Sequence, residues 1–198
     1  HSIPPEFSKD KEGYINLICN EMIPEIANNK LAEFCDVFCE EGYFNIKESK
    51  QILNVAKEHG LIPKIHADEF KYFGASKLAA KMDAISADHL MAITDEGIDE
   101  LHSSKTIATL LPGTTFFLKK KRYANGRNLI DKGCEVALAS DFNPGTCTIR
   151  SLSTIMLLGI NFCKMTLEES FKAITYNAAR SIGQKRIGMI KKDYYADL

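Results

Sequence analysis

Apolar residues along this chain switch between a helical spacing and short continuous runs. Between residues 11 and 28 they recur with the period of an α-helix, which predicts a helix kinked at Pro24. From residue 34 onward, apolar runs alternate with helix-favouring segments at a period of about 20 to 25 residues. The predicted strands are 34–38, 62–67, 84–87, 106–111 and 136–140; the further predicted helices are 48–58, 76–82, 94–101, 126–132, 150–161 and 167–182; and 111–117 is predicted to form a Pro-Gly turn.

This order of elements predicts an α/β fold. Strands that alternate with helices are parallel and joined by right-handed crossovers, and continuous apolar strands are typical of a sheet covered on both faces. The five predicted strands are fewer than the eight that close a (β/α)8 barrel. The chain is therefore either an open sheet or the later part of such a barrel with its first strands missing. Pro4 and Pro5, directly after the first three residues, are typical of a turn between two elements and favour the partial barrel.

The composition is that of a folded, soluble protein. Of the 198 residues, 45% are hydrophobic and 26% are charged, with 25 basic and 26 acidic side chains and a net charge of -1. These values exclude a disordered chain, and the longest basic run, 119–122, is too short to predict nucleic-acid binding. The sequence lacks the apolar stretch of about 18 to 20 residues that a membrane helix requires, and residues 1–6 have no signal-peptide character. We therefore expect a cytoplasmic protein with neither a nucleic-acid nor a membrane partner.

The six cysteines are expected to be free thiols. They are scattered through a chain with enough apolar residues to fold without disulfides, which is typical of a reducing compartment. Cys35 and Cys39 are the one close pair, and their spacing places both side chains on one face of a strand. We interpret this pair as core packing and not as a zinc knuckle.

Polar residues gather at the carboxyl ends of the predicted strands. Because parallel strands end at the same edge of a sheet, these side chains are expected to meet on the face where barrels and open α/β sheets build their sites. The residues are Glu40, His66, Asp68, Glu69, Asp88, His89 and Asp141. His59 and His102, by contrast, follow helical segments and are interpreted as structural or solvated.

Several of these strand-end residues have more than one chemical interpretation. His66 and His89 each end an apolar strand beside a carboxylate, where an imidazole is either a metal ligand or a general acid or base. Asp141 leaves a buried strand and enters a turn, so it either forms an Asx turn or a helix N-cap, or binds a divalent metal through oxygen. Glu69 lies three residues after His66, close enough to share the same site.

Five segments together resemble the imidazolonepropionase family of the amidohydrolase superfamily. They are HSIPPE at 1–6, HADEF at 66–70, AISADHL at 84–90, LPGTTFF at 111–117 and SDFNPG at 140–145. The resemblance implies a distorted (β/α)8 barrel with one divalent metal, zinc or iron, and a small β-sandwich. Residues 1–186 are then the later part of the barrel, and 187–198 begin the return into the sandwich.

The resemblance also implies a role for each matching residue. His66 and Asp141 would bind the metal, Glu69 would contact the substrate as an acid or base, and His89 would polarise the carbonyl group. Asp141 would in addition accept the proton of the attacking water and pass it to the leaving nitrogen. The catalytic residues implied are thus Glu69, His89 and Asp141, and the substrate-binding residues are His1, Glu69, Asn143, Gly145 and Thr146.

The reaction of this family is the hydrolysis of 4-imidazolone-5-propanoate to N-formimidoyl-L-glutamate in histidine degradation, so a small-molecule substrate is expected. The chain departs from the superfamily pattern because it contains no His-x-His pair, which would supply two further metal ligands. We therefore interpret the chain as an internal fragment of such an enzyme and expect weak metal binding and no activity from it alone. Its open flank would favour association into homo-oligomers. The alternatives are another cyclic amidohydrolase or a deaminase, or a metal-free binding protein.

Overall fold

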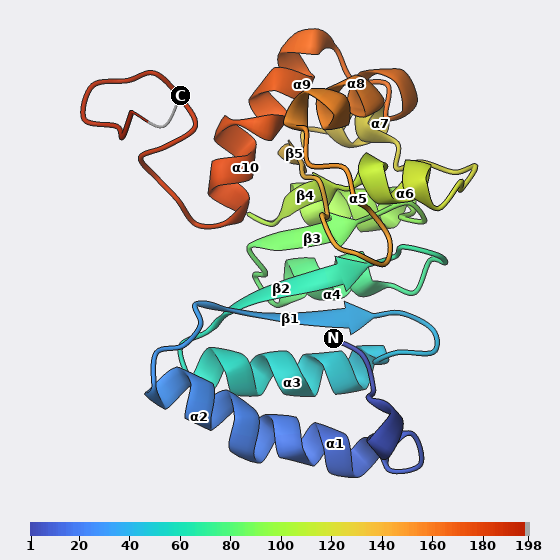
Figure 1. Ribbon diagram of the computed structural model, residues 1–198, viewed down its shortest axis with the longest axis vertical. Helices are drawn as coiled ribbons and strands as arrows, with labels where there is room; N and C mark the ends of the chain where they lie inside the picture. Colours follow the sequence, from blue (N-terminus) through green and yellow to red (C-terminus); the bar gives the residue numbers. More distant parts are fainter. Residues whose placement is uncertain (197–198) are drawn as a thin grey trace.

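The computed structural model describes residues 1–196 and has an α/β architecture built on one parallel sheet (Figure 1). The sheet contains β1 (Phe34–Cys39), β2 (Ile62–Ala67), β3 (Ser86–His89), β4 (Ile107–Leu110) and β5 (Val136–Leu138). Each strand pairs with the next one in the chain, in the order β1-β2-β3-β4-β5, and every pair is parallel. Sequential parallel strands with helical crossovers form the wall of a (β/α)8 barrel, so the predicted fold class of a partial barrel is confirmed.

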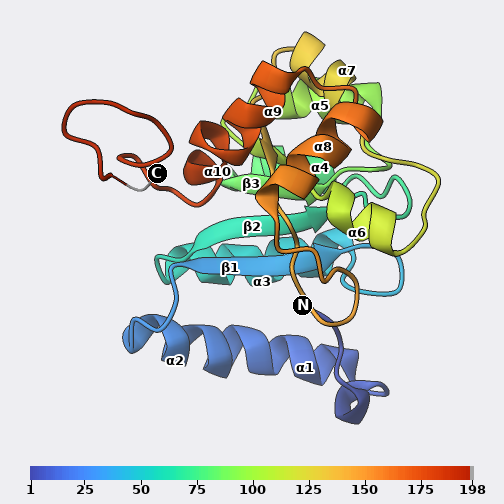
Figure 2. The ribbon, with the colours of Figure 1, turned by 45° about the horizontal axis from the view of Figure 1, so that its top comes forward.

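Helices follow the strands and cover the outer face of the sheet (Figure 2). They are α1 (Lys11–Leu17), α2 (Ile23–Asn28), α3 (Ile46–Glu58), α4 (Ala75–Lys81), α5 (Asp95–His102), α6 (Pro112–Phe117), α7 (Gly126–Asp131), α8 (Leu152–Phe162), α9 (Leu167–Ile174) and α10 (Tyr176–Ser181), with short helical segments η1 (Pro5–Phe7) and η2 (Ile18–Met22). Several begin at a capping side chain. Asn45 and Glu48 form a capping box at the start of α3, for example.

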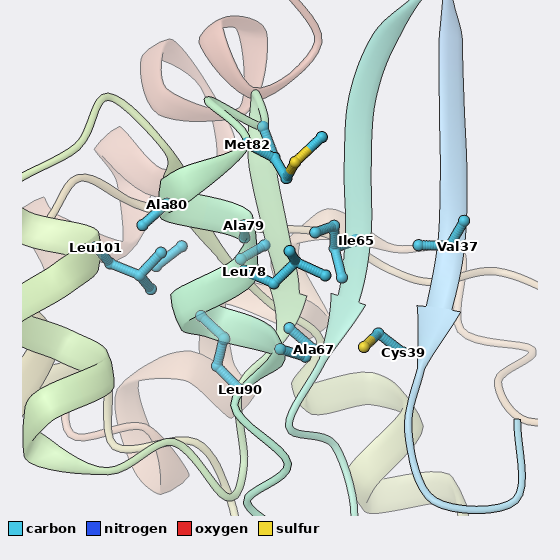
Figure 3. Packing of buried hydrophobic residues seen from close by; sticks show 14 of the residues in the cluster. Val37, Cys39, Ile65, Ala67, Leu78, Ala79, Ala80, Met82, Leu90 and Leu101 are labelled. Atoms are coloured by element: carbon cyan, nitrogen blue, oxygen red, sulfur yellow. The ribbon is translucent and has the colours of Figure 1, made fainter. Parts of the chain in front are cut away.

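The two faces of the sheet have different chemistry. Because side chains alternate along a strand, Val37 and its register partner Ile65 point to one face, together with Ala87 of β3. These residues join the apolar core with α4, as Figure 3 shows. The opposite face carries the intervening residues. Its register rows are Asp36, Lys64, Ser86 and Ile107, then Phe38, His66, Asp88 and Thr109. The second face is therefore partly polar, and it leads directly to the strand ends where function was predicted.

The predicted helix 11–28 contains an irregular segment instead of a simple kink. Between α1 and α2, residues 18–22 form a π-helix, in which the N–H of Ile23 bonds to the carbonyl of Ile18. Pro24 has no N–H, so the α-helical bond from its position to Asn20 cannot form. The wider turn lies immediately before the proline and lets the helix continue without that bond.

Two other predicted elements were wrong. Residues 112–117 form helix α6 and not a Pro-Gly turn, because Pro112 occupies the first helical position, where its missing N–H costs nothing. The predicted helix 167–182 is two helices, since Thr175 between α9 and α10 has a non-helical backbone (φ -117°, ψ -91°). The boundaries of β3 also differ from the prediction, because Asp88 and His89 belong to the strand and 84–85 do not.

The remaining structural expectations concern the cysteines and the chain ends. All six cysteines are free thiols, as expected. Of the pair interpreted as core packing, Cys39 is buried in the core and Cys35 is partly buried against it. In residues 1–196, no helix combines the length and the apolar character that crossing a bilayer requires. Residues 187–196 form turns and irregular structure, while 197–198 of the predicted return segment lie outside the described residues. The β-sandwich assignment of 187–198 stays a prediction.

Candidate active site

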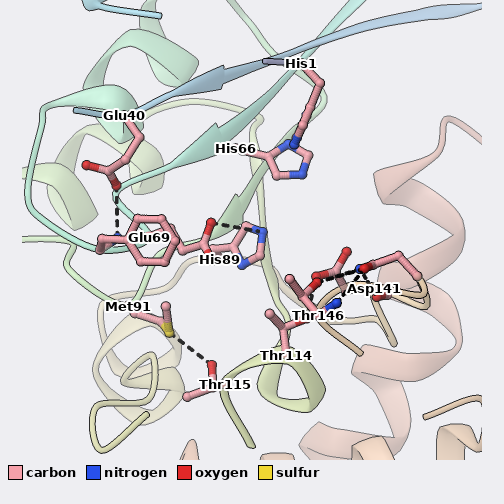
Figure 4. A network of polar contacts seen from close by, with 12 residues as sticks. His1, Glu40, His66, Glu69, His89, Met91, Thr114, Thr115, Asp141 and Thr146 are labelled. Atoms are coloured by element: carbon pink, nitrogen blue, oxygen red, sulfur yellow. Dashed lines mark hydrogen bonds and ion pairs between the residues drawn. The ribbon is translucent and has the colours of Figure 1, made fainter. Parts of the chain in front are cut away.

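A cavity of about 600 Å3 lies at the carboxyl edge of the sheet and collects most of the predicted site residues. Its lining includes His1, His66, Glu69, His89, Asp141, Asn143 and Thr146, together with Phe38, Tyr43, Phe70, Thr114 and Leu118. Figure 4 shows the polar members of this group arranged around a common space. Across residues 1–196, the lining does not include the predicted Gly145, which lies on the adjoining loop.

Left-handed backbone turns direct the chain at three strand exits. Asp68 (φ 48°), His89 (φ 78°) and Asp141 (φ 50°) all have positive φ, a conformation in which aspartate and histidine are enriched among non-glycine residues. Such residues end the strand abruptly instead of extending it. The chain therefore turns at the sheet edge, where the side chains of His89 and Asp141 line the cavity.

His66 is held by a carboxylate that the sequence patterns did not single out. Its Nδ1 lies 2.9 Å and 2.8 Å from the two carboxylate oxygens of Asp36 on the neighbouring strand β1. Burial alone would lower the pKa of this imidazole, but the hydrogen bond and the charge of Asp36 outweigh it and raise the pKa above its ordinary value. Asp36 lies inside a strand and not at its end, so the search along strand ends missed it.

Glu69 and His89 form a buried pair with opposite protonation tendencies. Burial raises the pKa of the Glu69 carboxyl from 4.5 to about 7, even though the charge of His66 lowers it. Burial and the nearby charge of His66 lower the pKa of His89 to about 3. The Nε2 of His89 lies 3.7 Å from Oε2 of Glu69. At neutral pH the pair therefore consists of a neutral imidazole and a carboxyl group poised between its two protonation states.

Asp141 and the loop after it are connected by short-range hydrogen bonds. The hydroxyl of Thr114 donates to Oδ2 of Asp141, which fixes one oxygen of that carboxylate. The side-chain amide of Asn143 donates to the carbonyl of Asp141, and its Oδ1 accepts from the N–H of Thr146 at 2.7 Å and from the N–H of Gly145 at 2.9 Å. Asn143 thus fixes the conformation of the loop, and the backbone N–H groups of Gly145 and Thr146 donate to its side-chain oxygen.

Other strand-end carboxylates have structural partners. Asp68 is fully buried, and its carboxylate accepts hydrogen bonds from the N–H groups of Phe73, Ala75 and Ser76 at the start of α4. Glu40, also buried, accepts from the N–H of Phe70 at 2.9 Å and from that of Glu41. These two carboxylates position the loops around the cavity, and neither belongs to its lining within residues 1–196.

Asp88 lies beside His66 on the polar face of the sheet and does not belong to the cavity lining within residues 1–196. One of its oxygens is 3.7 Å from Nζ of Lys64, which also donates to Ser86. Its other oxygen has no hydrogen-bond partner among the described residues. Burial raises the pKa of Asp88, and the charge of Lys64 opposes that rise.

Two sets of side chains could hold a metal ion. His1, Asp36 and His66 offer three ligand atoms within 4.8 Å of one another. The pair predicted from the sequence, His66 and Asp141, lines the same cavity. His66 belongs to both sets, and its Nδ1 is already bonded to Asp36.

Comparison with known proteins identifies the family. The model of the "Amidohydrolase family" matches residues 41–198. This chain is an amidohydrolase-family member. Imidazolonepropionases from Shouchella clausii and Geobacillus thermodenitrificans are 50% and 48% identical to it over its whole length, which confirms the resemblance seen in the motifs. The match covers 44% and 47% of those relatives, so the chain spans about half of their length.

Solved structures agree with the amidohydrolase barrel. Aspergillus niger ochratoxinase superposes with a TM-score of 0.69 at 19% identity, over 89% of this chain and 47% of the other. A zinc-bound adenosine deaminase from Xanthomonas campestris superposes with a TM-score of 0.71 at 14% identity, over 89% of this chain and 46% of the other. At these identities the likeness concerns the fold alone, and it matches the partial barrel described above.

Proposed function

We propose that this amidohydrolase-family chain serves imidazolone hydrolysis: the opening of 4-imidazolone-5-propanoate to N-formimidoyl-L-glutamate in histidine degradation. The observation that carries the proposal is the convergence of two imidazoles and two carboxylates on one cavity at the sheet edge. They are His66, Glu69, His89 and Asp141. The imidazolonepropionases that match the whole chain at 44–50% identity support this substrate over those of other amidohydrolases.

The side chains at the cavity fit a divalent metal. Asp36 engages Nδ1 of His66, which leaves Nε2 as the ring nitrogen for a metal, and Asp141 offers carboxylate oxygen. Imidazole and carboxylate ligands suit zinc or iron. We assign His66 and Asp141 as the ligands from this chain. When bound, the metal supplies a nucleophile at neutral pH by lowering the pKa of water to about 7.

Two ligands are fewer than the three that catalytic zinc sites normally take from the protein. The 198 residues contain no His-x-His pair. We therefore propose that the chain alone binds zinc weakly and hydrolyses little substrate, and that ligands from outside these residues complete the site.

The protein groups divide the proton transfers and the charge stabilisation between them. In the reaction, water oxygen bonds to the ring carbonyl carbon, the C–N bond breaks, and the nitrogen gains a proton. Asp141 accepts the water proton and returns it to that nitrogen, because its carboxylate lines the cavity and Thr114 holds one of its oxygens in place. His89 stays neutral in its buried position and donates a hydrogen bond to the developing oxyanion.

Glu69 and the substrate-binding residues orient the ring and its propionate. A carboxyl with a pKa of about 7 can both accept a hydrogen bond from a ring N–H and relay a proton, which suits Glu69 to contact the imidazolone ring. The propionate of the substrate is anionic, and the amide and hydroxyl groups of Asn143 and Thr146, both in the cavity lining, can donate hydrogen bonds to such a group. We assign the loop of Asn143, Gly145 and Thr146 to the propionate, and we assign His1, in the same cavity lining, to substrate contact.

The test is a chimera in which this chain replaces the corresponding segment of the Shouchella clausii imidazolonepropionase, assayed beside the chain alone. We expect the chimera to bind one zinc or iron and to consume 4-imidazolone-5-propanoate without releasing ammonia. Asp141→Asn in the chimera should abolish turnover, while Asp83→Asn, on an exposed turn, should leave it unchanged. A folded, metal-loaded chimera that does not open the imidazolone ring would refute the proposal, and ammonia release would assign the site to a deaminase.

A further inference from the structure

Asp36 is bonded to one candidate metal ligand and lies close to a second imidazole. Both of its oxygens lie within 2.9 Å of Nδ1 of His66. The same carboxylate lies 3.4 Å from Nδ1 of His1. The two imidazole rings meet edge to face with 4.4 Å between their centroids. Figure 4 shows these two rings close together.

The surroundings keep Asp36 in place for this contact. It lies within β1, one residue before the buried Val37, so its backbone is fixed by the ladder to β2. Its side chain is 27% exposed and that of His66 is 20% exposed, so the bond between them is partly shielded from water. His1 is stacked on the ring of Phe38, with 5.2 Å between centroids, which holds it on the same side of the strand.

The chemistry of the pair determines which nitrogen of His66 is available. An ionised carboxylate only accepts hydrogen bonds, so the Nδ1 that faces it must carry a hydrogen. In a neutral imidazole, the other nitrogen then holds a free lone pair, which is the form that binds metals. A carboxylate that fixes the tautomer of a ligating histidine typically changes metal affinity by 10- to 100-fold, on the order measured for such partners.

We propose that Asp36 is the positioning residue of this site: it fixes the Nδ1–H tautomer of His66, so that Nε2 is the atom presented to a divalent metal. This inference rests on the proposed function. It also selects between the two metal sets, because Asp36 then acts through His66 and is not itself a ligand. His1 next to the same carboxylate is thereby held beside the metal-facing ring.

The first test measures the tautomer without any metal. Nitrogen-15 NMR of the histidine rings in the 198-residue chain, at about pH 9 where histidine is ordinarily neutral, distinguishes Nδ1–H from Nε2–H. His66→Gln identifies the signal of His66. We expect Nδ1–H in the wild type and in Asp36→Asn, which keeps an acceptor oxygen, and loss of that preference in Asp36→Ala. The ring of His59, bonded through Nδ1 to the carbonyl of Val55, reports whether the variant is otherwise intact.

The second test measures zinc affinity by titration of the same three proteins. We expect Asp36→Ala to bind zinc 10- to 100-fold more weakly than the wild type, and Asp36→Asn to recover most of that loss, on the order seen for second partners of ligating histidines. Asp83→Asn is the control, because this exposed carboxylate lies on a turn, outside the cavity lining, and its charged contact is Lys57 at 3.7 Å. Its zinc affinity should equal that of the wild type.

The outcomes separate this inference from the proposed function. If Asp36→Ala leaves the tautomer of His66 unchanged, or if zinc binds through Nδ1 of His66 and Asp36, the positioning role is refuted. If the tautomer changes as expected but the wild type and the chimera bind no zinc, the positioning of His66 stands and the metal-dependent function falls.

Discussion

Replacing Asp68 by alanine should destabilise the protein strongly, although this residue does not touch the cavity. Its carboxylate accepts three backbone N–H groups where α4 begins, and it lies between His66 and Glu69. Alanine removes every one of these acceptors. The loop that carries Glu69 would then lose the bonds that fix it to α4.

The size of the effect follows from which donors are buried. The N–H groups of Ala75 and Ser76 are buried, and each costs about 1 to 3 kcal/mol when it is left without an acceptor. The N–H of Phe73 is partly buried and can bond to water instead. The loss is therefore about 2 to 6 kcal/mol, a large share of the roughly 5 to 15 kcal/mol that stabilises a typical domain.

Urea unfolding followed by far-UV circular dichroism measures this loss, with Asp83→Ala as the matched control. Asp83 has nearly the same left-handed backbone, with a φ of 53° against 48° for Asp68, but its side chain is exposed. Its carboxylate lies 3.7 Å from Nζ of Lys57. The backbone cost of alanine should be alike at the two positions. We expect Asp68→Ala to lower the urea midpoint by about 1 M or more beyond the control. Equal midpoints for the two variants would show that the three hydrogen bonds contribute nothing.

Three further predictions concern protonation, metal and packing. Folding raises the pKa of Glu69 from 4.5 to about 7 and therefore disfavours its charged form. The free energy of unfolding of Glu69→Gln, relative to that of the wild type, should rise between pH 4.5 and about pH 7 and stay constant above that range. A difference in melting temperature that does not change with pH would contradict this. Zinc at 100 times its dissociation constant should raise the free energy of unfolding by about 2.7 kcal/mol. This increase should vanish with a chelator and in the variants His66→Gln and Asp141→Asn. If both variants keep the increase, zinc binds elsewhere. Gly126→Ala should lower the free energy of unfolding by about 1 to 3 kcal/mol, because the added Cβ would lie 2.9 Å from the carbonyl oxygen of Cys163. An unchanged denaturant midpoint would refute this packing.

The fold was largely predictable because its signals are local and repeated. Strand β2 was predicted with its observed limits, since an apolar run of that length between Gly60 and the polar 68–69 has few other interpretations. Helix α6 was missed because Pro112-Gly113 has the composition of a turn, and the same proline is also compatible with the first position of a helix, as observed. The break at Thr175 was missed for a similar reason, because the apolar pattern continues through it.

The candidate site was predictable wherever position along the strand decides the outcome. His66, His89 and Asp141 were expected at one edge, because parallel strands end together, and all three line the cavity. Asp36 was not predictable in this way, because it lies in the middle of strand β1 and reaches the site only through its hydrogen bond to His66 on the neighbouring strand. Asp68 and Asp141 show the same limit, because both follow strands. Only their hydrogen-bond partners in the structure show that Asp68 binds the N–H groups at the start of α4, whereas Asp141 lies in the cavity beside Thr114.

The positive φ angles at residues 68, 89 and 141 also constrain how this edge of the sheet can evolve or be engineered. A left-handed backbone costs most side chains roughly 1 to 2 kcal/mol, so a library randomised at these three codons would favour aspartate, asparagine, histidine and glycine among its stable clones. Thr114 and Thr146 line the same cavity from positions outside this group of positive angles. Substitutions aimed at new ring-shaped substrates therefore suit Thr146 better than the strand exits, whereas Thr114 is best kept because its hydroxyl holds Asp141.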